Sequence, residues 1–272
     1  TKVIEGLSVA IHGRSYAKQA VTDDLSATYP APLPGHFNIG LLHTCADGRE
    51  GHQPYAPCNV DALAAKGYAY WALGHVHARE VLRTDPWIVF PGNLQGRHAR
   101  ETGPKGAALV TVEEGCVAAV EHRTLDDVRW VCCEVNVETA TSIEDVANLV
   151  SSALRRALEE AGTRWVCARV IVQGVTEAHA ELSRDPARIK AEIHRAANDL
   201  DRVWVEKIKL DTRAQLDLSA LMDRDDPIGG LLRSLRTLRA DPAALQEHAK
   251  RFDDLSAKLP HEYAQADGAL EL

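Results

Sequence analysis

The chain has 272 residues, of which 45% are hydrophobic and 26% charged, so it is long enough to bury one or two cores. Its 18 glycines, 12 prolines and 5% aromatic residues exclude a collagen-like or low-complexity chain. The formal net charge is −8 and no third of the chain has a basic excess. The composition therefore indicates no extended basic surface for binding nucleic acid.

Cysteine usage and hydropathy indicate the compartment. The six cysteines include no C-x-x-C pair and are spread over a long chain, as is typical of free thiols in a reducing environment. No apolar run approaches the ~20 residues that a membrane helix needs, and no signal sequence opens the chain. We therefore expect a cytoplasmic protein that makes no membrane contact.

The first region, residues 1–127, consists of short apolar runs broken by turns. Strands are predicted over Leu7–Ile11, Phe37–Leu42, Tyr68–Leu73, Trp87–Phe90 and Ala107–Val112. A short helix is predicted over Asp61–Lys66 and another over Tyr16–Leu25. The strands are continuously apolar and do not alternate, which indicates sheets covered on both faces.

The second region, residues 128–211, alternates strands and helices. Strands are predicted over Trp130–Val137, Trp165–Val172 and Val203–Leu210. Thr141–Glu144 is a capping box that opens a helix ending at Gly162. A second helix begins at Asp185-Pro186. This order predicts a small α/β domain.

The third region, residues 212–272, is predicted to be a helical extension. Helices begin at Asp226-Pro227 and Asp241-Pro242, and four leucines recur at helical spacing in Leu231, Leu232, Leu235 and Leu238. This row could be a docking face for a partner helix or an ordinary intramolecular contact. The five tryptophans, which are not interleaved with Arg or Lys, are predicted to be core or domain-contact residues.

Three histidines at the ends of predicted strands are candidate metal ligands. Gly74-His75-Val76-His77 follows an apolar strand directly, and His43 ends another apolar strand. Neutral imidazoles at the ends of buried strands are plausible metal ligands, so we expect His43, His75 and His77 to converge. The pattern is also compatible with capping or core histidines whose ring nitrogens are satisfied by backbone groups.

These residues resemble a known family. Leu41–Thr44, Tyr55–Cys58, Tyr70–His77 and the stretch from Phe90 to Gly106 are similar to the calcineurin-like metallophosphoesterases, and most closely to bacterial DNA repair exonucleases of the YhaO and SbcD type. The resemblance is specific over residues 1–127. It implies the C-terminal part of a four-layer αββα sandwich, followed by an α/β capping domain over 128–211.

The resemblance also implies a site and its cofactors. His75 would ligate one metal together with His43, and His77 would ligate a second; family members use two Mn²⁺ or similar divalent ions. The family's upstream motifs, D-x-H, G-D and G-N-H-[DE], do not occur in this chain, so the bridging carboxylate and the catalytic histidine are missing from it. We therefore expect a C-terminal portion of a longer protein, inactive by itself.

A basic stretch lies near the predicted site. Arg97 and His98 could contact substrate phosphates, because a guanidinium fits a phosphate in bidentate fashion. Alternatively, Arg97 and Arg100 lie on a solvated loop where Glu101 neutralises them.

Three functions remain open. The first is metal-dependent DNA exonuclease or endonuclease activity in repair, beside an SMC-like ATPase that supplies much of the DNA affinity. The second is a phosphoesterase for nucleotides or small phosphodiesters, and the third is a non-catalytic module that binds the ATPase. Strands left unpaired by an absent segment could also favour a homodimer.

Overall fold

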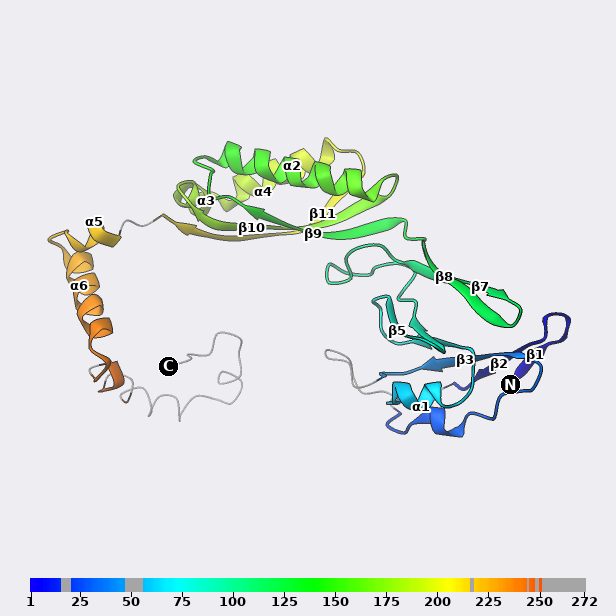
Figure 1. The fold of residues 1–272 in the computed structure, drawn as a ribbon. Coiled ribbons are helices and arrows are strands. Elements are labelled where there is room, and N and C mark those ends of the chain that lie inside the picture. Colours follow the sequence, from blue (N-terminus) through cyan, green and yellow to red (C-terminus); the bar gives the residue numbers. More distant parts are fainter. Residues whose placement is uncertain (16–20, 47–55, 216–217, 244, 248–249, 251–272) are drawn as a thin grey trace. The chain divides into compact units, whose positions relative to one another are not determined.

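The computed structural model of the chain describes residues 1–15, 21–46, 56–215, 218–243, 245–247 and 250. The chain forms two compact units, Thr1–Arg213 and Ala214–Leu272. The first unit contains both strands and helices, and the described elements that lie wholly within the second are helices (Figure 1). The predicted α/β fold class is confirmed as a mixed α/β architecture with several sheets.

The described residues of the first region up to Phe90 form a six-stranded sheet. Its strands, in spatial order, are β1 (Lys2–Ile4), β2 (Val9–Gly13), β3 (Phe37–His43), β4 (Tyr70–Gly74), β6 (Trp87–Phe90) and β5 (Glu80–Thr84). The four central strands are parallel to one another, and the two outer strands run antiparallel to their neighbours. The carboxyl ends of β3 and β4 therefore lie at the same edge of the sheet.

Close packing between β3 and β4 depends on a glycine. Trp71 of β4 is fully buried and its indole nitrogen donates to the Leu63 carbonyl at 3.0 Å. Gly40 of β3 lies against this ring, and a Cβ at that position would come within 2.2 Å of it. Leu63 belongs to helix α1 (Val60–Ala64), which is capped by Asn59. This helix covers the face of the sheet on which Trp71 is buried.

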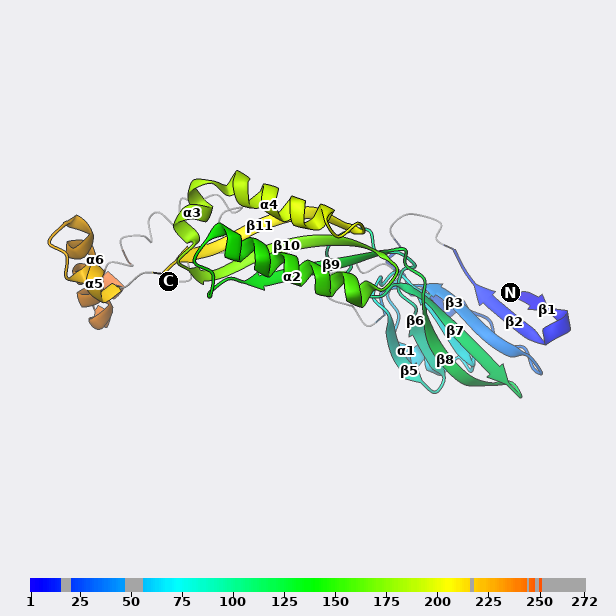
Figure 2. The same cartoon turned by 90° about the horizontal axis from the view of Figure 1, so that it is seen from above.

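A two-stranded ribbon follows the sheet. It consists of β7 (Gly106–Glu113) and β8 (Cys116–Thr124), which pair antiparallel (Figure 2). Strand β7 confirms the predicted run at Ala107–Val112, whereas β1, β5 and β8 were not predicted. The short helix expected over Tyr16–Leu25 lies partly outside the described residues, and its last residue opens a 3-10 turn, η2 (Leu25–Thr28).

The second region forms a separate three-stranded sheet in the order β11 (Val203–Ala214), β10 (Trp165–Thr176), β9 (Val128–Asn136). Helices α2 (Ile143–Ala161) and α4 (Pro186–Asn198) lie on one face of this sheet, and a short α3 (His179–Arg184) precedes α4 (Figure 1). The buried side chains of both helices and of the strands form one apolar core. The division of the first 211 residues at 127/128 stays a prediction.

The capping box at the start of α2 was predicted one residue too early. Ser142, rather than Thr141, is the N-cap, and Asp145, rather than Glu144, is its reciprocal partner. The Asp145 carboxylate accepts hydrogen bonds from the backbone nitrogens of both Thr141 and Ser142. The shorter acid competes successfully because it satisfies two backbone donors at once.

The prediction that every tryptophan packs in a core or a domain contact is wrong for two of them. Trp204 is 68% exposed and Trp165 is 53% exposed. Both lie on strands of the three-stranded sheet, whose helices cover the opposite face. Side chains along these strands therefore alternate between the two faces of the sheet, and Val166 and Val205 face the helices.

A buried carboxylate joins the ribbon to the three-stranded sheet. Asp126 is 3% exposed and accepts hydrogen bonds from Arg129 Nε at 2.6 Å and Nη2 at 3.1 Å. Arg164 Nε lies 3.3 Å from the same carboxylate. Burial acts to raise the pKa of Asp126, but the hydrogen bonds and charge of Arg129 outweigh it, and the net effect is a lowered pKa. The group therefore stays ionised between two guanidinium groups.

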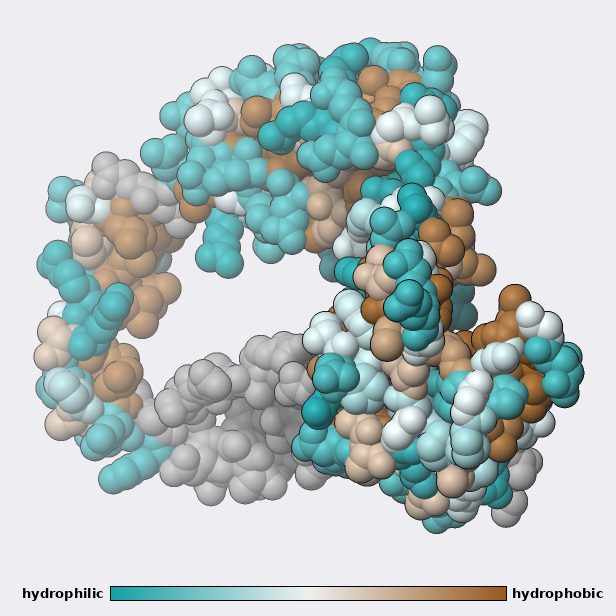
Figure 3. All heavy atoms as spheres, turned by 45° about the vertical axis from the view of Figure 1, so that its right-hand side comes forward, coloured by the Kyte–Doolittle hydropathy of each residue, from teal (hydrophilic) through white to brown (hydrophobic). Residues whose placement is uncertain are grey.

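The second unit contains α5 (Leu218–Met222) and α6 (Pro227–Ala240), which pack against each other. Asp226 caps α6 through the Gly229 nitrogen, as the Asp-Pro pair predicts. Leu231 and Leu235 remain largely exposed, and apolar surface is visible on this unit (Figure 3). The choice between a docking face and an internal contact stays open.

Candidate metal centre

Two adjacent parallel strands bring His43 and His75 together. His43 is the last residue of β3 and is paired in register with Gly74, the last residue of β4, so that His75 begins the turn after β4. Nδ1 of His75 lies 3.3 Å from Nε2 of His43. The ring centroids are 5.1 Å apart and the rings are tilted by 70°. Residues 32 positions apart thus form one imidazole pair, as the strand-end argument predicts.

The backbone around His75 is adapted to this close approach. A Cβ on Gly74 would lie 3.1 Å from Nδ1 of His43, so glycine leaves room for the ring. His75 itself has a φ of 106°, in the left-handed region that residues with a side chain rarely adopt. Strained backbone of this kind clusters at functional sites, where the surrounding structure holds it in place. Thr44 contributes by donating its nitrogen to the Gly74 carbonyl at 3.1 Å.

The environment keeps His43 neutral. Desolvation lowers the pKa of His43 below its ordinary value, and the nearby charge of His77 lowers it further. A neutral imidazole retains a lone pair, which a metal ligand requires. The same effect indicates that His77 is close enough to His43 to influence it electrostatically.

His77 has a different partner. Its Nδ1 lies 2.6 Å from Oε1 of Glu101, whose side chain is only 8% exposed. Nη2 of Arg97 is 3.4 Å from Nδ1 and 3.5 Å from Nε2 of the same ring. The third predicted ligand is therefore held by an acidic residue from a separate loop.

Glu101 was missed as a functional candidate by the sequence analysis. The alternative of a solvated loop in which Glu101 only neutralises arginines is wrong for this residue, because its carboxylate is buried. Burial acts to raise its pKa, but hydrogen bonds from the Arg97 nitrogen, His77 and Asn93 lower the pKa of Glu101 to about 2. Asn93 and Arg97 belong to the same loop between β6 and β7 as Glu101, whereas His77 lies in the turn after β4, so the local sequence does not show the contact with His77.

Arg97 and His98 lie beside His77. The Arg97 side chain is 67% exposed, and Nε2 of His98 lies 3.5 Å from Glu101 Oε1. Both side chains are open to solvent and next to a candidate ligand. Their role in binding substrate stays a prediction.

The donor set fits one divalent ion at the His43–His75 pair. Two imidazole nitrogens that ligate the same ion at ~2.0–2.1 Å in tetrahedral geometry are about 3.4 Å apart, close to the observed separation. Over the described ranges, no three His, Cys, Asp or Glu side chains form a group that could hold a metal ion. The described residues therefore supply imidazole ligands without the carboxylates that hard cations prefer.

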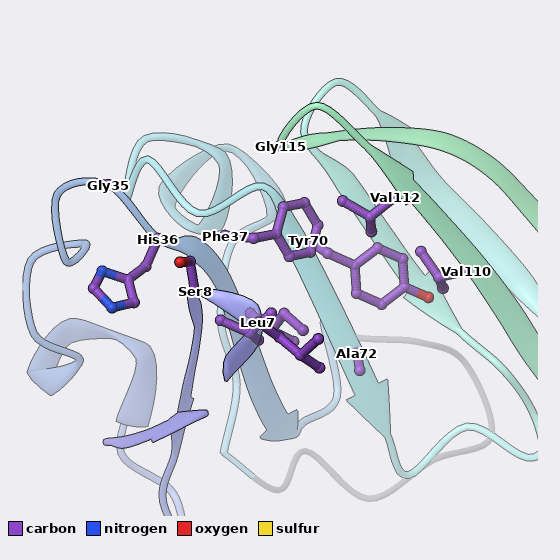
Figure 4. Close-up of a pocket in the computed structure, with 12 residues that line it drawn as sticks. Leu7, Ser8, Gly35, His36, Phe37, Tyr70, Ala72, Val110, Val112 and Gly115 are labelled. Carbon is purple, nitrogen blue, oxygen red and sulfur yellow. The ribbon is translucent and has the colours of Figure 1, made fainter. Parts of the chain in front are cut away.

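A separate cavity of about 860 Å³ lies on the six-stranded sheet (Figure 4). Phe37 and Tyr70 line it from the sheet, Val110 and Val112 line it from β7, and Leu7 lies at its side. None of the three candidate ligand histidines lines it. Its lining is mainly apolar, so it offers no comparable chemistry.

Comparisons with known proteins gave two matches, both to metallophosphoesterases. Residues 130–213 match the family model of the middle domain of metallophosphoesterase YhaO. The chain is 33% identical over 277 aligned positions to an uncharacterized metallophosphoesterase, YhaO, of Bacillus subtilis strain 168. The alignment covers 96% of this chain and 66% of the relative.

No helix among the described residues is long and apolar enough to cross a membrane. The family model covers the three-stranded sheet and its helices, whereas the alignment with the relative extends over the imidazole pair as well. The chain is thus similar to metallophosphoesterases over most of its length, and it spans about two thirds of the relative.

Proposed function

We propose that this chain forms part of a metal-dependent phosphodiesterase that hydrolyses DNA. The observation that carries the proposal is the His43–His75 pair at the carboxyl edge of two parallel strands, with the nitrogens 3.3 Å apart. Similarity to a metallophosphoesterase supports phosphoester chemistry in general. DNA as the substrate, exonuclease or endonuclease action and a role in repair are the finer parts of the proposal.

The residues divide into ligands and substrate contacts. His43 and His75 would hold one divalent ion and His77 a second, with Mn²⁺ as the expected metal. Such ions polarise phosphoryl oxygens and lower the pKa of bound water, which supplies the nucleophile. The neutral state of His43 suits it to this role. We propose that carboxylates outside the described residues complete the ligand set.

Arg97 suits phosphate binding because its guanidinium is exposed and lies next to His77. A guanidinium presents paired donors to phosphate oxygens. His98 lies beside it and can add a further donor when protonated. The two side chains would orient the phosphodiester at the metal-binding histidines.

The chain has a net charge of −8, so it offers little cationic surface of its own for binding DNA. We propose that an SMC-like ATPase partner supplies much of the cationic surface. The same acidic balance favours, as a second candidate, a phosphoesterase for nucleotides or small phosphodiesters. The six cysteines, all within described segments, are free thiols, which supports a reducing cytoplasmic location.

The test compares two substrates in the intact protein that contains this chain. Hydrolysis of a DNA oligonucleotide and of bis-p-nitrophenyl phosphate is measured with added Mn²⁺, for the unmodified protein, for His75→Ala and for His36→Ala. His36 is a partly exposed histidine outside the imidazole pair, so its variant should retain full activity. We expect His75→Ala to lose both activities. Hydrolysis of the small phosphodiester alone would favour the second candidate, and no hydrolysis of either would favour a non-catalytic module.

A further inference from the structure

We infer that Glu101 is a positioning residue that fixes the tautomer and the orientation of His77, so that the lone pair of the ring lies on Nε2, the nitrogen that would bind a metal ion. The inference rests on the metal-binding role proposed for His77. It gives the buried carboxylate of Glu101 a role in orienting a candidate metal ligand.

The two oxygens of Glu101 have separate partners. Oε2 accepts hydrogen bonds from the Arg97 backbone nitrogen at 2.8 Å and from Asn93 Nδ2 at 2.9 Å. Oε1 faces Nδ1 of His77 at 2.6 Å. Because Oε2 is held by two donors, the carboxylate is not free to rotate, and Oε1 stays aimed at the imidazole.

The backbone of His77 is fixed by the same loops. Its carbonyl accepts hydrogen bonds from the Asn93 nitrogen at 3.2 Å and from Nζ of Lys105 at 3.4 Å. The Asn93 carbonyl in turn accepts from the Gly106 nitrogen at 3.0 Å. Two segments of the first unit, the turn after β4 and the loop between β6 and β7, thus meet at this histidine, so both its main chain and its ring have a defined place.

The chemistry of this contact determines which nitrogen carries the proton. A carboxylate can only accept, so a neutral His77 must place its proton on Nδ1 and its lone pair on Nε2. Metal-binding histidines commonly donate their second ring N–H to a carboxylate, which orients the ring and increases its basicity. Arg97 offers donors only, so it cannot hold the Nδ1 proton as Glu101 does. Its Nη2 lies 3.5 Å from Nε2 of His77, so the guanidinium would have to move aside when a metal ion binds that nitrogen.

Glu101→Gln is the informative variant. The glutamine oxygen can keep the two hydrogen bonds from Arg97 and Asn93, which places the amide NH₂ against Nδ1 of His77. That group donates, so the proton of a neutral His77 is expected to move to Nε2, the nitrogen proposed to bind metal. Glu121→Gln is the matched control, since Glu121 is an exposed residue of β8 paired with Arg123.

The first measurement is ring ¹⁵N NMR of the metal-free chain at a pH where histidines are neutral, with His77 assigned by His77→Gln. We expect the Nδ1–H tautomer in the unmodified chain and in Glu121→Gln, and the Nε2–H tautomer in Glu101→Gln. An Nε2–H tautomer in the unmodified chain would overturn the inference without recourse to any variant. An unchanged tautomer in a folded Glu101→Gln chain would overturn it as well.

The second measurement is Mn²⁺ affinity of the intact protein by calorimetry. Loss of a carboxylate behind a ligand typically weakens metal binding by about 10–100-fold, and we expect that loss for Glu101→Gln and none for Glu121→Gln. A tautomer shift in a protein that binds no Mn²⁺ would contradict the proposed function while leaving the positioning of His77 intact. Unchanged Mn²⁺ affinity in Glu101→Gln, with binding lost in His77→Gln, would refute the positioning role.

Discussion

Replacing Gly40 by alanine should destabilise the sheet that carries the candidate metal centre. The new Cβ would lie 2.2 Å, 2.4 Å and 2.7 Å from three carbons of the Trp71 indole. Optimal carbon contacts lie at about 3.5–4.0 Å, so either the ring or strand β3 must move by more than ~1 Å. Trp71 is fully buried and hydrogen-bonded to Leu63, which leaves little room for that movement.

Overpacking of this kind typically reduces the free energy of unfolding by ~1–3 kcal/mol, and three close contacts to a buried ring favour the upper value. For a urea m-value of ~2–3 kcal/mol/M, that corresponds to a midpoint lower by about 1 M. Urea unfolding followed by circular dichroism measures the shift. Gly6→Ala is the matched control, because a Cβ there meets nothing within 4 Å.

The steric cause can be tested separately with a double-mutant cycle. Trp71→Leu removes the ring carbons that the new Cβ would strike, so Gly40→Ala should have a smaller effect in that background than in the unmodified chain. A Gly40→Ala chain that unfolds within 0.5 kcal/mol of the unmodified one, or additive effects in the cycle, would refute the reasoning.

Three further predictions follow from the same structure. Asp126→Asn should remove the part of the free energy of unfolding that depends on an ionised carboxylate. Because the pKa of Asp126 is lower in the folded than in the unfolded chain, that part is present above pH ~4 and is lost as the pH falls further. The urea midpoint should therefore change less between pH 7 and pH 3 in the variant than in the unmodified chain. Ser142→Ala should reduce the free energy of unfolding by ~1 kcal/mol, whereas Thr141→Ala, one residue outside the cap, should have a smaller effect in the same assay. This chain assayed alone with Mn²⁺ should hydrolyse bis-p-nitrophenyl phosphate far more slowly than the intact protein does; equal rates that His75→Ala abolishes in both would contradict the need for ligands outside the chain.

The imidazole pair was accessible to sequence reasoning because it depends on a local rule. A histidine that ends one buried parallel strand and a histidine that follows the next must lie at the same edge, and His43 and His75 do so. Strands β3, β4 and β6 were predicted for the same reason, since their apolar runs are continuous. Strand β8 was not, because Cys116–Thr124 has no buried residue and includes charged residues.

The carboxylate behind His77 was not accessible in this way. Glu101 contacts Asn93 and Arg97 within its own loop, but it reaches His77 only after that loop has folded against the turn that follows β4. Trp204 shows the opposite failure: its sequence context is strand-like and apolar, yet its side chain is 68% exposed because α2 and α4 lie on the other face of the three-stranded sheet. Both errors arise where tertiary placement, rather than local pattern, decides burial.

The left-handed backbone at His75 limits which residues the position can tolerate. At a φ of 106°, glycine fits with the least strain, and asparagine or aspartate is better accommodated than alanine or any β-branched residue. The backbone alone would therefore select glycine here, and an imidazole is retained against that preference. A homologue that had given up metal chemistry would be expected to drift toward glycine or asparagine at this position, so the residue found there in distant homologues would distinguish active lineages from purely structural ones.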